Sequence, residues 1–332
     1  MRIFLAGDHY TGTGPANVTQ YYIDNLPAGT LYQKRRSKLL RAAEIVIDTV
    51  RADVVVYSGY SKQNIFGMKA AKILGKPTAY IMHGCVEHEN EINLEPDEEM
   101  NSVERRTLDM ADLVIAVSRT FCSWLKEYYP VYSGKFDYIT NGVDTSLAGR
   151  EKDTRERDRH MIYTVGGGMP RKKIRYICSA IKILRETYDP DLYLCITGAS
   201  GADSDAIGSF DCADNRGLVT YEESTGLFRK AALFVQNSCF ETFGLAPVEA
   251  LMCGCPILCS RHVGALELFD DLRANDIIDN YDDPHEIAEK IRYNLENPNA
   301  DRLSGCFGRE KSSWKARSMV LESKLSKLVS KR

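Results

Sequence analysis

The stretch "ETFGLAPVEALMCGCP", residues 241–256, combines two carboxylates with a poorly capped helix start. Pro247 suits the first helical position, which makes Ala246 the N-cap, and an alanine there leaves the first backbone N–H groups without a side-chain acceptor. Such a terminus attracts anions, phosphates above all. Glu241 and Glu249 stand eight residues apart around it, and carboxylates accept bidentate hydrogen bonds from vicinal hydroxyls. We therefore predict a ligand that is both phosphorylated and polyhydroxylated.

A second anion-binding candidate is "TVGGGMPRKK", residues 164–173, where a strand meets a helix. Three glycines give a flexible backbone, and Arg171, Lys172 and Lys173 follow at the predicted helix start. Cations are unfavourable at that end of the helix dipole unless an anion neutralises them. This conflict favours a phosphate site, with three exposed basic residues on a helix face as the alternative.

A third glycine-bearing loop is "GDHYTGTGPANV", residues 7–18. Gly12 and Gly14 allow a ligand to approach the backbone closely, and a helix begun by Pro15 favours an anion. A dinucleotide fingerprint would need a third glycine where Asn17 stands and an acidic residue at the end of the second strand. NAD is therefore disfavoured, and an ordinary strand-to-helix turn is the alternative to a ligand site.

The elements that must position these loops alternate regularly along the chain. Strands are predicted at 2–7, 53–59, 77–84, 112–118 and 136–142, and again at 161–167, 191–198, 217–222, 232–238, 256–260 and 276–280. Helices are predicted at 15–26, 37–51, 64–74, 95–110, 119–129 and 172–188. The strands are continuously apolar, which is typical of a parallel sheet covered on both faces. The predicted fold class is therefore α/β.

A charge run, "REKDTRERDRH" at residues 150–160, contains no apolar side chain and separates two series of alternating elements. It predicts a linker between two doubly wound domains, residues 1–150 and 151–305. Residues 306–332 form a basic, amphipathic pattern that predicts a final helix.

Composition narrows the class of protein further. The net charge of −3 gives no indication of a nucleic-acid partner. The apolar segment at the N-terminus is too short for a signal peptide, because polar residues follow it early. No apolar run approaches membrane-spanning length. The ten cysteines are scattered, and Cys253, Cys255 and Cys259 have only His262 nearby, which makes a weak zinc candidate. We expect reduced thiols, no metal site and a cytoplasmic location.

These motifs together resemble a known family. The E-x7-E pattern from Glu241 to Glu249, followed by "ALMCGCP", closely resembles the signature of retaining GT-B glycosyltransferases of family 4. "TNGVD" (140–144) is similar to that family's domain-closing loop, "YIMHG" (80–84) to its strand before an active-site histidine, and "VGGGMPRKK" to its diphosphate loop. The resemblance runs nearly end to end. It implies a GT-B fold, in which an acceptor-side and a nucleotide-sugar Rossmann-like domain face a cleft.

The resemblance also implies roles for the residues of the E-x7-E motif. Glu241 would contact the hydroxyls of the donor sugar, and Glu249 would hold the ribose hydroxyls of the nucleotide. The backbone N–H groups near the sugar and phosphates would be those of Phe243, Gly244 and Leu245.

Three further positions match the family's diphosphate, glycine and active-site loops, and one departs from them. Lys172 matches the diphosphate lysine, whereas Gly167 stands where the family has an arginine, so that Arg171 would supply the missing charge. Gly14 matches the N-terminal glycine loop. His83 matches the histidine near the reacting sugar, with a core histidine at a strand end as the alternative.

The loop at residues 219–223, "VTYEE", resembles the family's base-binding turn. The resemblance implies that this loop, with Tyr221 at its centre, touches the base through its backbone.

The function implied is transfer of a sugar from a nucleotide diphosphate sugar to a glycan, a lipid-linked glycan or a protein, with retention and without a cofactor or metal. Cations and a helix dipole would stabilise the departing diphosphate. Two alternatives remain open. One is a nucleotide-sugar epimerase or hydrolase of the same fold, and the other is an inactive subunit that only binds a nucleotide sugar.

The C-terminal segment suggests a location for this activity. Residues 302–332 carry nine Lys or Arg residues and two Glu residues. The resemblance implies that the final helix packs back on the first domain. At helical spacing, the apolar residues of this helix would form one face, made of Trp314, Met319, Val320, Leu325 and Leu328. Because basic surfaces are attracted to anionic lipid, we also expect peripheral contact with the inner face of a membrane through this basic C-terminus.

Overall fold

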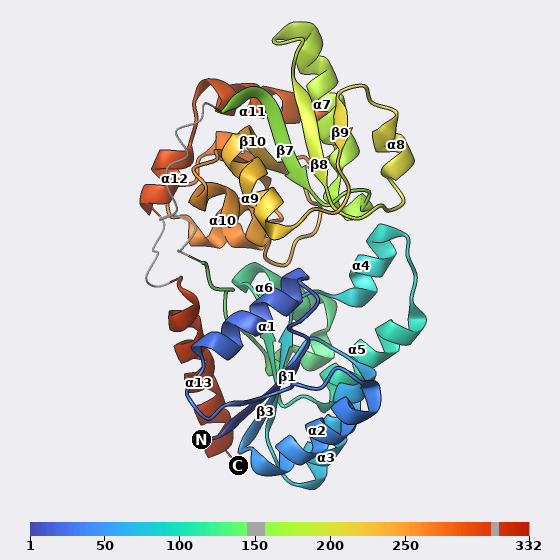
Figure 1. The fold of residues 1–332 in the computed structure, drawn as a ribbon, viewed down its shortest axis with the longest axis vertical. Helices are drawn as coiled ribbons and strands as arrows, with labels where there is room; N and C mark the ends of the chain where they lie inside the picture. The colour runs from blue at the N-terminus through green and yellow to red at the C-terminus, as the bar shows by residue number, and fades with distance from the viewer. Residues whose placement is uncertain (145–156, 307–311, 332) are drawn as a thin grey trace. The chain divides into compact units, whose positions relative to one another are not determined.

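The structure, a computed structural model, describes residues 1–144, 157–306 and 312–331. The chain forms two compact units (Figure 1), each built on its own sheet. The N-terminal unit comprises Met1–His88, Pro96–Gly142 and Glu310–Arg332, and the C-terminal unit comprises Glu89–Glu95 and Val143–Arg309. The predicted α/β class with two doubly wound domains is confirmed. Most of the charge run at residues 150–160 lies outside the described residues.

The N-terminal unit is built on a six-stranded parallel sheet in the order β2-β1-β3-β4-β5-β6. Its strands are β1 (Ile3–Gly7), β2 (Leu31–Tyr32), β3 (Val54–Ser58), β4 (Thr78–Met82), β5 (Leu113–Ala116) and β6 (Phe136–Tyr138). Every residue of β1, β3 and β4 is buried, as their continuous apolar sequences predict. The chain leaves β1 toward β2 and returns beyond β1 to β3, so the carboxyl ends of β1 and β3 open a crevice where ligands bind in such sheets.

Helices follow most strands of this unit. They are α1 (Gly14–Asn25), α2 (Lys38–Arg51), α3 (Lys62–Ile73), α4 (Val86–Asn93), α5 (Glu98–Met110), α6 (Arg119–Tyr128) and α13 (Trp314–Ser330). The side chains of Ser61, Asp97 and Ser118 accept first-turn N–H groups at the starts of α3, α5 and α6. Within the described ranges, no helix has both the length and the apolar composition needed to cross a membrane.

Helix α13 packs against α1 within the N-terminal unit. The Trp314 ring stacks on Tyr21 at a centroid distance of 4.7 Å, and Lys324 forms an ion pair with Asp137. The exposed face of this helix differs from the prediction. Leu325 is buried with Trp314, whereas Met319 is 64% exposed, with Val320 also exposed. The predicted single apolar face is therefore split between the core and the solvent.

The C-terminal unit holds a second six-stranded parallel sheet, in the order β12-β11-β10-β7-β8-β9. Its strands are β7 (Asp158–Val165), β8 (Tyr193–Thr197), β9 (Ala213–Asn215), β10 (Ala231–Gln236), β11 (Ile257–Ser260) and β12 (Ile277–Ile278). The chain runs from β7 outward to β9 and then returns to place β10 on the other side of β7. This reversal opens a crevice at the carboxyl ends of β7 and β10.

Six helices cover this sheet in the described part of the unit. They are α7 (Ile174–Thr187), α8 (Ser204–Gly208), α9 (Tyr221–Lys230), α10 (Leu245–Met252), α11 (Pro284–Glu296) and α12 (Ala300–Cys306). Strand residues such as Leu194 and Leu233 pack with Ile177 and Ile181 of α7 and with Ile291 of α11 in one buried cluster. The burial of these aliphatic side chains holds the two helices on the sheet.

The strand predicted at residues 217–222 is wrong. Helix α9 begins inside this segment, and the short strand β9 precedes it at 213–215. The apolar and β-branched residues suggested a strand, but Thr220 and Glu223 form a capping box in which each side chain accepts the other's backbone N–H. Local capping therefore outweighs strand propensity here.

The packing of α13 predicts that alanine substitutions at two glycines differ in their effect on stability. A Cβ at Gly142 would overlap the Trp314 ring and lie 2.7 Å from the Trp314 Cα, whereas a Cβ at Gly134 meets no atom within 4 Å. We expect Gly142→Ala to destabilise the N-terminal unit by about 1–3 kcal/mol through overpacking, and Gly134→Ala to leave it nearly unchanged. Both tryptophans of the chain lie in this unit, so a urea titration followed by tryptophan fluorescence measures it. Equal midpoints for the two variants would contradict the packing.

Candidate active site

A buried carboxylate and two cations meet at the crevice between β7 and β10. The Oε2 atom of Glu241 accepts hydrogen bonds from Lys172, from Arg171 Nη1 at 3.3 Å and from Gln236 Nε2 at 2.8 Å. The loops are also tied through the backbone, since Cys239 N–H donates to the Arg171 carbonyl at 2.9 Å. The structure thus brings together three residues that the sequence placed in the site, Arg171, Lys172 and Glu241.

Charge holds this cluster in its ionised form. Burial raises the pKa of Glu241, but the charges of Lys172 and Arg171 outweigh it and lower that pKa to about 2. Burial lowers the pKa of Lys172, against the opposing effect of Glu241. A buried ion pair of this kind is costly to desolvate and is retained only with compensating hydrogen bonds. Within the described residues, the side chains of Arg171, Lys172, Gln236 and Ser238 all donate to Oε2 of this carboxylate.

The glycine loop before Lys172 has no room for side chains. Gly166 adopts φ 135°, and a Cβ there would overlap the Lys172 side chain. Gly167 adopts φ 54°, and its Cβ would overlap the carbonyl oxygen of Ala199. A Cβ at Gly168 would overlap Ser204. An arginine is therefore excluded at Gly167 in this loop, and Arg171 is the residue that brings a second cation to Glu241.

The cations do not lie on the helix that the sequence predicted at 172–188. Pro170–Lys172 form a short 3₁₀ turn, Lys173 takes a left-handed conformation with φ 53°, and α7 begins at Ile174. The predicted conflict with the helix dipole is therefore reduced, because Arg171 precedes the helix and pairs with a carboxylate.

A second acidic residue in contact with Arg171 was not predicted from the sequence. Glu89 Oε2 lies 3.7 Å from Arg171 Nε, and Asn93 Oδ1 accepts the Arg171 backbone N–H at 3.3 Å. Both residues belong to α4, a helix that the sequence analysis left out, and to the segment Glu89–Glu95 of the C-terminal unit. The polar sequence "VEHENEIN" gave no apolar periodicity by which to find it.

The helix after Glu241 begins earlier than predicted. Its N-cap is Gly244, with φ 83°, and α10 starts at Leu245. Ala246 is therefore not the N-cap, Pro247 is the third helical residue, and Glu249 is the fifth. The main prediction is unaffected, because the N-cap lacks a side chain and makes no capping hydrogen bond. The first-turn N–H groups of this eight-residue helix consequently receive no side-chain acceptor from the N-cap.

Two of the predicted residues near this helix start contribute in different ways. Phe243 is 2% exposed, and its carbonyl accepts the Ala265 N–H at 2.7 Å, so its side chain belongs to the core. Gly244 has a left-handed φ that a side chain would strain, and a Cβ there would lie 3.0 Å from the Glu241 Cγ. The glycine thus allows the backbone to turn directly beside the carboxylate.

Glu249 has electrostatic surroundings opposite to those of Glu241. Burial raises its pKa to about 7, and the nearby charge of Asp144 adds to that rise. A carboxyl group with a pKa in this range changes its charge near neutral pH. Glu249 can therefore exist both as a hydrogen-bond donor and as an acceptor under ordinary conditions.

His83 and Gly14 lie in the N-terminal unit, around the crevice between β1 and β3. His83 Nε2 lies 2.8 Å from Ser58 Oγ, which lies 2.7 Å from Thr19 Oγ1. Thr19 donates its only hydroxyl proton to the Pro15 carbonyl at 2.9 Å, so Ser58 must donate to Thr19 and accept from His83. This chain of bonds places the proton of neutral His83 on Nε2. Burial lowers the His83 pKa to about 4, which keeps the ring neutral at pH 7.

Gly14 is the first residue of α1, with Thr13 as the N-cap, and Thr13 makes no capping hydrogen bond with its side chain. A Cβ at Gly14 would meet no atom within 4 Å. The space beside this helix start is therefore open.

Tyr221 does not lie in a loop as predicted. It is the first residue of α9, and its side chain is 44% exposed. The capping box fixes this segment as a helix start, so the expected loop at 219–223 is wrong, while the contact of its backbone with a base stays a prediction.

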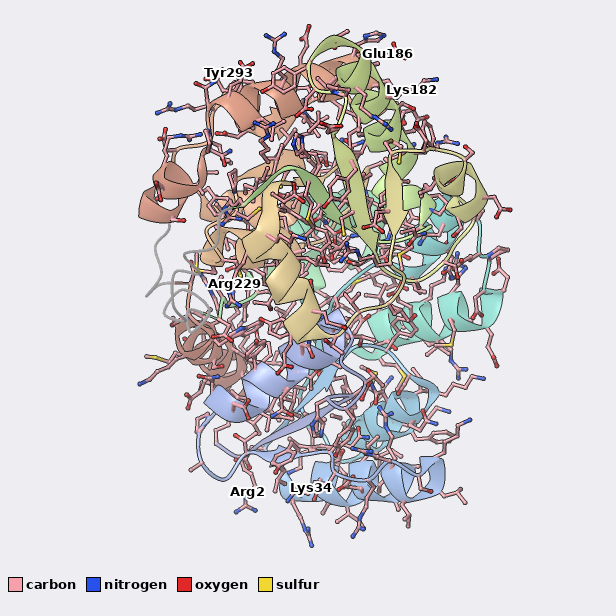
Figure 2. All side chains as sticks on the ribbon, turned by 45° about the horizontal axis from the view of Figure 1, so that its top comes forward. Arg2, Lys34, Lys182, Glu186, Arg229 and Tyr293 are labelled. Atoms are coloured by element: carbon pink, nitrogen blue, oxygen red, sulfur yellow. The ribbon has the colours of Figure 1, made fainter. Side chains whose placement is uncertain are left out.

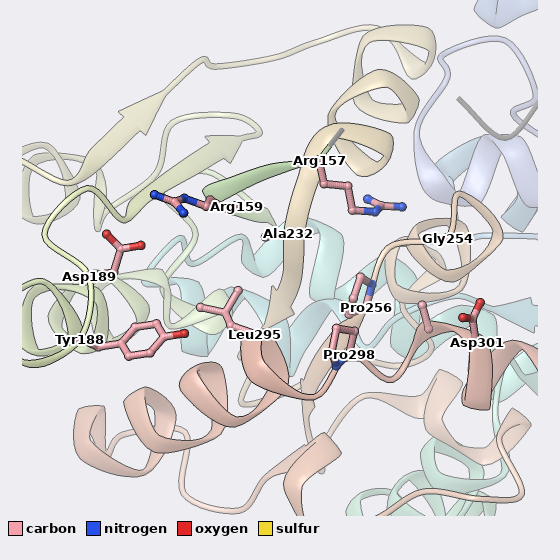
Figure 3. Close-up of a pocket in the computed structure, with 11 residues that line it drawn as sticks. Arg157, Arg159, Tyr188, Asp189, Ala232, Gly254, Pro256, Leu295, Pro298 and Asp301 are labelled. Carbon is pink, nitrogen blue, oxygen red and sulfur yellow. The ribbon is translucent and has the colours of Figure 1, made fainter. Parts of the chain in front are cut away.

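A cavity of about 720 Å³ lies at the opposite, amino-terminal edge of the same sheet (Figure 3). It is lined by Arg157, Asp189, Pro256 and Asp301, among others, and by none of the predicted site residues. Arg157 is already engaged, since it donates to the carbonyls of Phe228, Ala231 and Cys253. This cavity therefore adds nothing to the cluster around Glu241.

In the part of the chain that the structure describes, one group has metal-ligand spacing, and it too lies at the amino-terminal edge. It consists of His160, Asp189 and Asp191. His160 Nδ1 is already paired with Asp189 at 2.9 Å, and Arg159 donates to its other ring nitrogen.

Comparison with known families agrees with this geometry. The model of the family described as "Glycosyltransferase Family 4" matches residues 4–147, and that of "Glycosyl transferases group 1" matches residues 148–305. The chain is a GT-B glycosyltransferase of family 4. Both halves of this glycosyltransferase thus carry a family match, and the C-terminal match includes the cluster around Glu241.

Its sequence relatives are distant and longer. A D-inositol 3-phosphate glycosyltransferase of Arthrobacter sp. (strain FB24) is 27% identical over 250 residues, which cover 68% of this chain and 59% of that protein. A probable sucrose-phosphate synthase of Thermosipho melanesiensis is 24% identical over 204 residues, which cover 57% of this chain and 46% of that protein. The matched region spans about three fifths of the length of the first of these relatives.

Solved structures share the fold of this glycosyltransferase. Anabaena HepE, solved in complex with UDP and glucose, superimposes with a TM-score of 0.70 at 15% identity and covers 98% of this chain and 99% of its own. Sucrose-phosphate synthase from Thermosynechococcus elongatus gives a TM-score of 0.70 at 17% identity, with complete coverage of both chains, 100% in each case.

The cluster around Glu241 predicts a pH-dependent contribution to stability. The pKa of Glu241 is lowered in the folded state, so its contribution is present above the unfolded pKa of about 4.5 and is lost as the pH falls toward about 2. Glu241→Gln should lower the free energy of unfolding at pH 7 by about 3 kcal/mol, since Lys172 loses its counter-charge. The difference from the wild type should shrink below pH 4.5.

Circular dichroism during chemical denaturation at several pH values measures this difference. Glu222→Gln is the matched control, because Glu222 is an exposed glutamate of the same unit. A destabilisation by Glu241→Gln that is the same at pH 3 and pH 7 would contradict the ion-pair account.

Proposed function

We propose that this glycosyltransferase transfers a sugar from a nucleotide diphosphate sugar to an acceptor with retention of configuration. The observation that carries the proposal is the buried cluster of Glu241, Lys172 and Arg171 at the crevice of β7 and β10. A carboxylate for hydroxyls lies there beside cations for phosphates, next to a helix start without a side-chain cap. This combination suits a sugar joined to a diphosphate.

The diphosphate is assigned to Lys172 and Arg171. Both are nearly buried, with side-chain exposures of 10% and 15%, and charges act strongly where water is excluded. As the bond between sugar and diphosphate breaks, negative charge develops on the leaving oxygen. Pre-positioned cations and the start of α10 stabilise that charge without rearranging. The reaction then needs no divalent metal.

The sugar and the ribose are assigned to the two glutamates. Glu241 is ionised, and its Oε1 can accept hydrogen bonds from sugar hydroxyls while Oε2 stays on Lys172. Glu249 would accept from the ribose hydroxyls as a carboxylate. The N–H groups of Gly244 and Leu245 are assigned to the sugar and phosphate. Phe243 contributes only its backbone, because its side chain is buried.

The N-terminal unit would supply the acceptor side. Neutral His83 is oriented by its bond to Ser58, and we assign this uncharged imidazole to the reacting sugar. The open space beside Gly14 leaves room for a ligand close to the backbone.

The names of similar proteins suggest which ligands to test first. HepE was solved with UDP and with UDP-glucose, so UDP-glucose is the first donor to try. One relative acts on D-inositol 3-phosphate by its name, which suggests a phosphorylated polyol beside the expected glycan, lipid-linked glycan or protein acceptors.

The proposal includes a cytoplasmic location with peripheral contact at the inner face of a membrane. The C-terminal helix α13 offers lysines for such contact, among them the exposed Lys315 and Lys327. Its Trp314, Leu321 and Leu325 are buried in the unit. Much of the apolar part of a membrane contact would therefore have to come from another surface.

The direct test is product analysis with nucleotide sugars and a panel of acceptors. Transfer predicts acceptor-dependent release of nucleoside diphosphate and an unchanged anomeric configuration in the product. Conversion or hydrolysis of the nucleotide sugar without an acceptor would favour the epimerase or hydrolase alternative. Binding without turnover of any donor would favour an inactive subunit.

Donor binding should depend on pH through Glu249. Hydrogen bonds from ribose favour the ionised carboxyl, so binding lowers a pKa that stands near 7 in the free protein and releases a proton. Affinity for UDP-glucose, whose diphosphate does not titrate in this range, should therefore rise as the pH increases through about 7. Calorimetry in buffers of different ionisation enthalpy measures the proton release.

Glu249→Gln provides the control for this pH dependence. It should abolish the proton release and weaken binding about tenfold or more, because charge-assisted hydrogen bonds contribute roughly 1.5–3 kcal/mol. Unchanged proton release in this variant would show that another group titrates.

The phosphate assignment predicts opposite effects at two residues. Lys172→Ala should weaken UDP binding about tenfold or more and leave uridine binding nearly unchanged, since only UDP carries phosphates. Glu89→Gln should strengthen UDP binding, because the Glu89 carboxylate competes with phosphate for Arg171. Glu91→Gln, on the exposed side of the same helix, removes the same charge and should have a smaller effect. Weaker UDP binding in Glu89→Gln would mean that Glu89 orients Arg171.

Turnover should continue in excess chelator. The proposal gives the cations Lys172 and Arg171 the role that a divalent metal has in other transferases. Initial rates with and without EDTA, measured on protein freed of metal, should agree. A loss of activity that magnesium restores would contradict the proposal and would assign a cation to carboxylates such as Asp8 or Asp144.

A further inference from the structure

Exposed apolar side chains gather on two neighbouring helices of the N-terminal unit. Helices α2 and α3 pack side by side (Figure 1), and many large apolar residues on them face solvent. On α2 these are Leu39, Leu40, Val46, Ile47 and Val50, and on or just after α3 they are Phe66, Ile73 and Leu74. We call this surface the α2–α3 face. Leu39 and Ile73 are 85% and 86% exposed, so the unit itself does not cover them.

The pattern on α2 is that of a helix with a second apolar side. Ile45 and Thr49 point into the unit and are fully buried. Leu39, Val46 and Val50 recur at spacings of seven and four residues, which places them along one side of a helix. Large apolar side chains exposed along one side of a helix indicate a candidate binding surface.

The same surface is strongly basic. Residues 34–76 carry ten Lys or Arg residues and three Asp or Glu residues, although the whole chain has a net charge of −3. The three acidic side chains are engaged locally. Glu44 accepts backbone N–H groups of residues 34 and 35, Asp48 pairs with Arg51, and Asp53 accepts the N–H of Arg2.

The basic side chains are mostly exposed. In the described part of the chain, Arg51 pairs with Asp48 and Lys62 with Glu99, whereas the exposed Arg35, Lys38, Lys69 and Lys72 are among those that form no ion pair. Lys34 projects outward from the unit (Figure 2). Cations therefore outnumber anions around the apolar residues.

We infer that the α2–α3 face docks on an anionic lipid bilayer. Apolar side chains enter the boundary between headgroups and acyl chains, while lysines and arginines around them meet anionic headgroups. A second copy of the chain fits less well, because two surfaces of equal positive charge repel each other. A nucleic acid fits less well too, because the exposed apolar side chains are aliphatic except for Phe66, and a single aromatic ring offers little stacking surface.

This inference rests on the peripheral location proposed above and moves the main contact from α13 to the α2–α3 face. Its test is co-sedimentation of the full chain with vesicles of phosphatidylcholine alone or with about one third phosphatidylglycerol, at low and high salt. We expect the protein to pellet with anionic vesicles at low salt and expect high salt to reduce the pelleted fraction. Leu39→Glu/Val50→Glu should reduce the bound fraction at least tenfold. The control Val131→Glu, at another exposed apolar residue of the same unit, should not reduce it.

A second pair of variants separates the two candidate surfaces. Lys69→Glu/Lys72→Glu changes the α2–α3 face, and Lys315→Glu/Lys327→Glu makes the same change of charge on α13. We expect only the first pair to lose most of the binding to anionic vesicles. Equal losses, or a loss confined to the α13 variant, would overturn the inference, as would the absence of pelleting in the wild type.

Two further measurements complete the test. A solution dimer that Leu39→Glu/Val50→Glu dissociates would also overturn the inference, in favour of a second copy of the chain. UDP-glucose binding in solution is measured for every variant and should match the wild type. Vesicle binding without donor binding would instead contradict the proposed function and leave the membrane surface intact.

Discussion

The ion pair between Glu241 and Lys172 is the constraint that the rest of the C-terminal unit must satisfy. Both side chains are nearly buried, and a charge in such a place is stable only if its partner is fixed. Gln236 donates a further hydrogen bond to the carboxylate. Gly166 has no Cβ, which leaves room for the lysine side chain. The strand order β9-β8-β7-β10 supplies the geometry, because it brings the loops after β7 and β10 to one crevice.

Much of this arrangement could be predicted from the sequence. Continuous apolar runs located eleven segments as strands, and ten of them contain a strand or part of one. The crevice followed from the general rule for parallel sheets, and residue chemistry then pointed to Glu241 and Lys172. Such predictions succeed where one physical cause dominates, as burial on both faces does for β1, β3 and β4.

The errors arose where two local causes compete or where the contact is distant in sequence. Residues 217–222 have strand-forming side chains, yet the reciprocal cap of Thr220 and Glu223 starts a helix there. Helix α10 starts earlier than predicted because Gly244, with its positive φ, is the N-cap, whereas the prediction placed Pro247 at the first helical position. Glu89 could not be predicted, because its contact with Arg171 joins residues 82 positions apart and follows no periodic pattern.

The two units do not coincide with the two halves of the sequence. The segment Glu89–Glu95 groups with the C-terminal unit although it lies between β4 and β5 in the chain, and α13 groups with the N-terminal unit although it comes last. Division of the polypeptide at the charge run would leave the second fragment without Glu89 and the first without the indole that stacks on Tyr21. Each fragment would then expose the surface on which a segment carried by the other fragment normally packs. Two co-expressed fragments should therefore reassociate as a non-covalent pair, and each alone should be prone to aggregation.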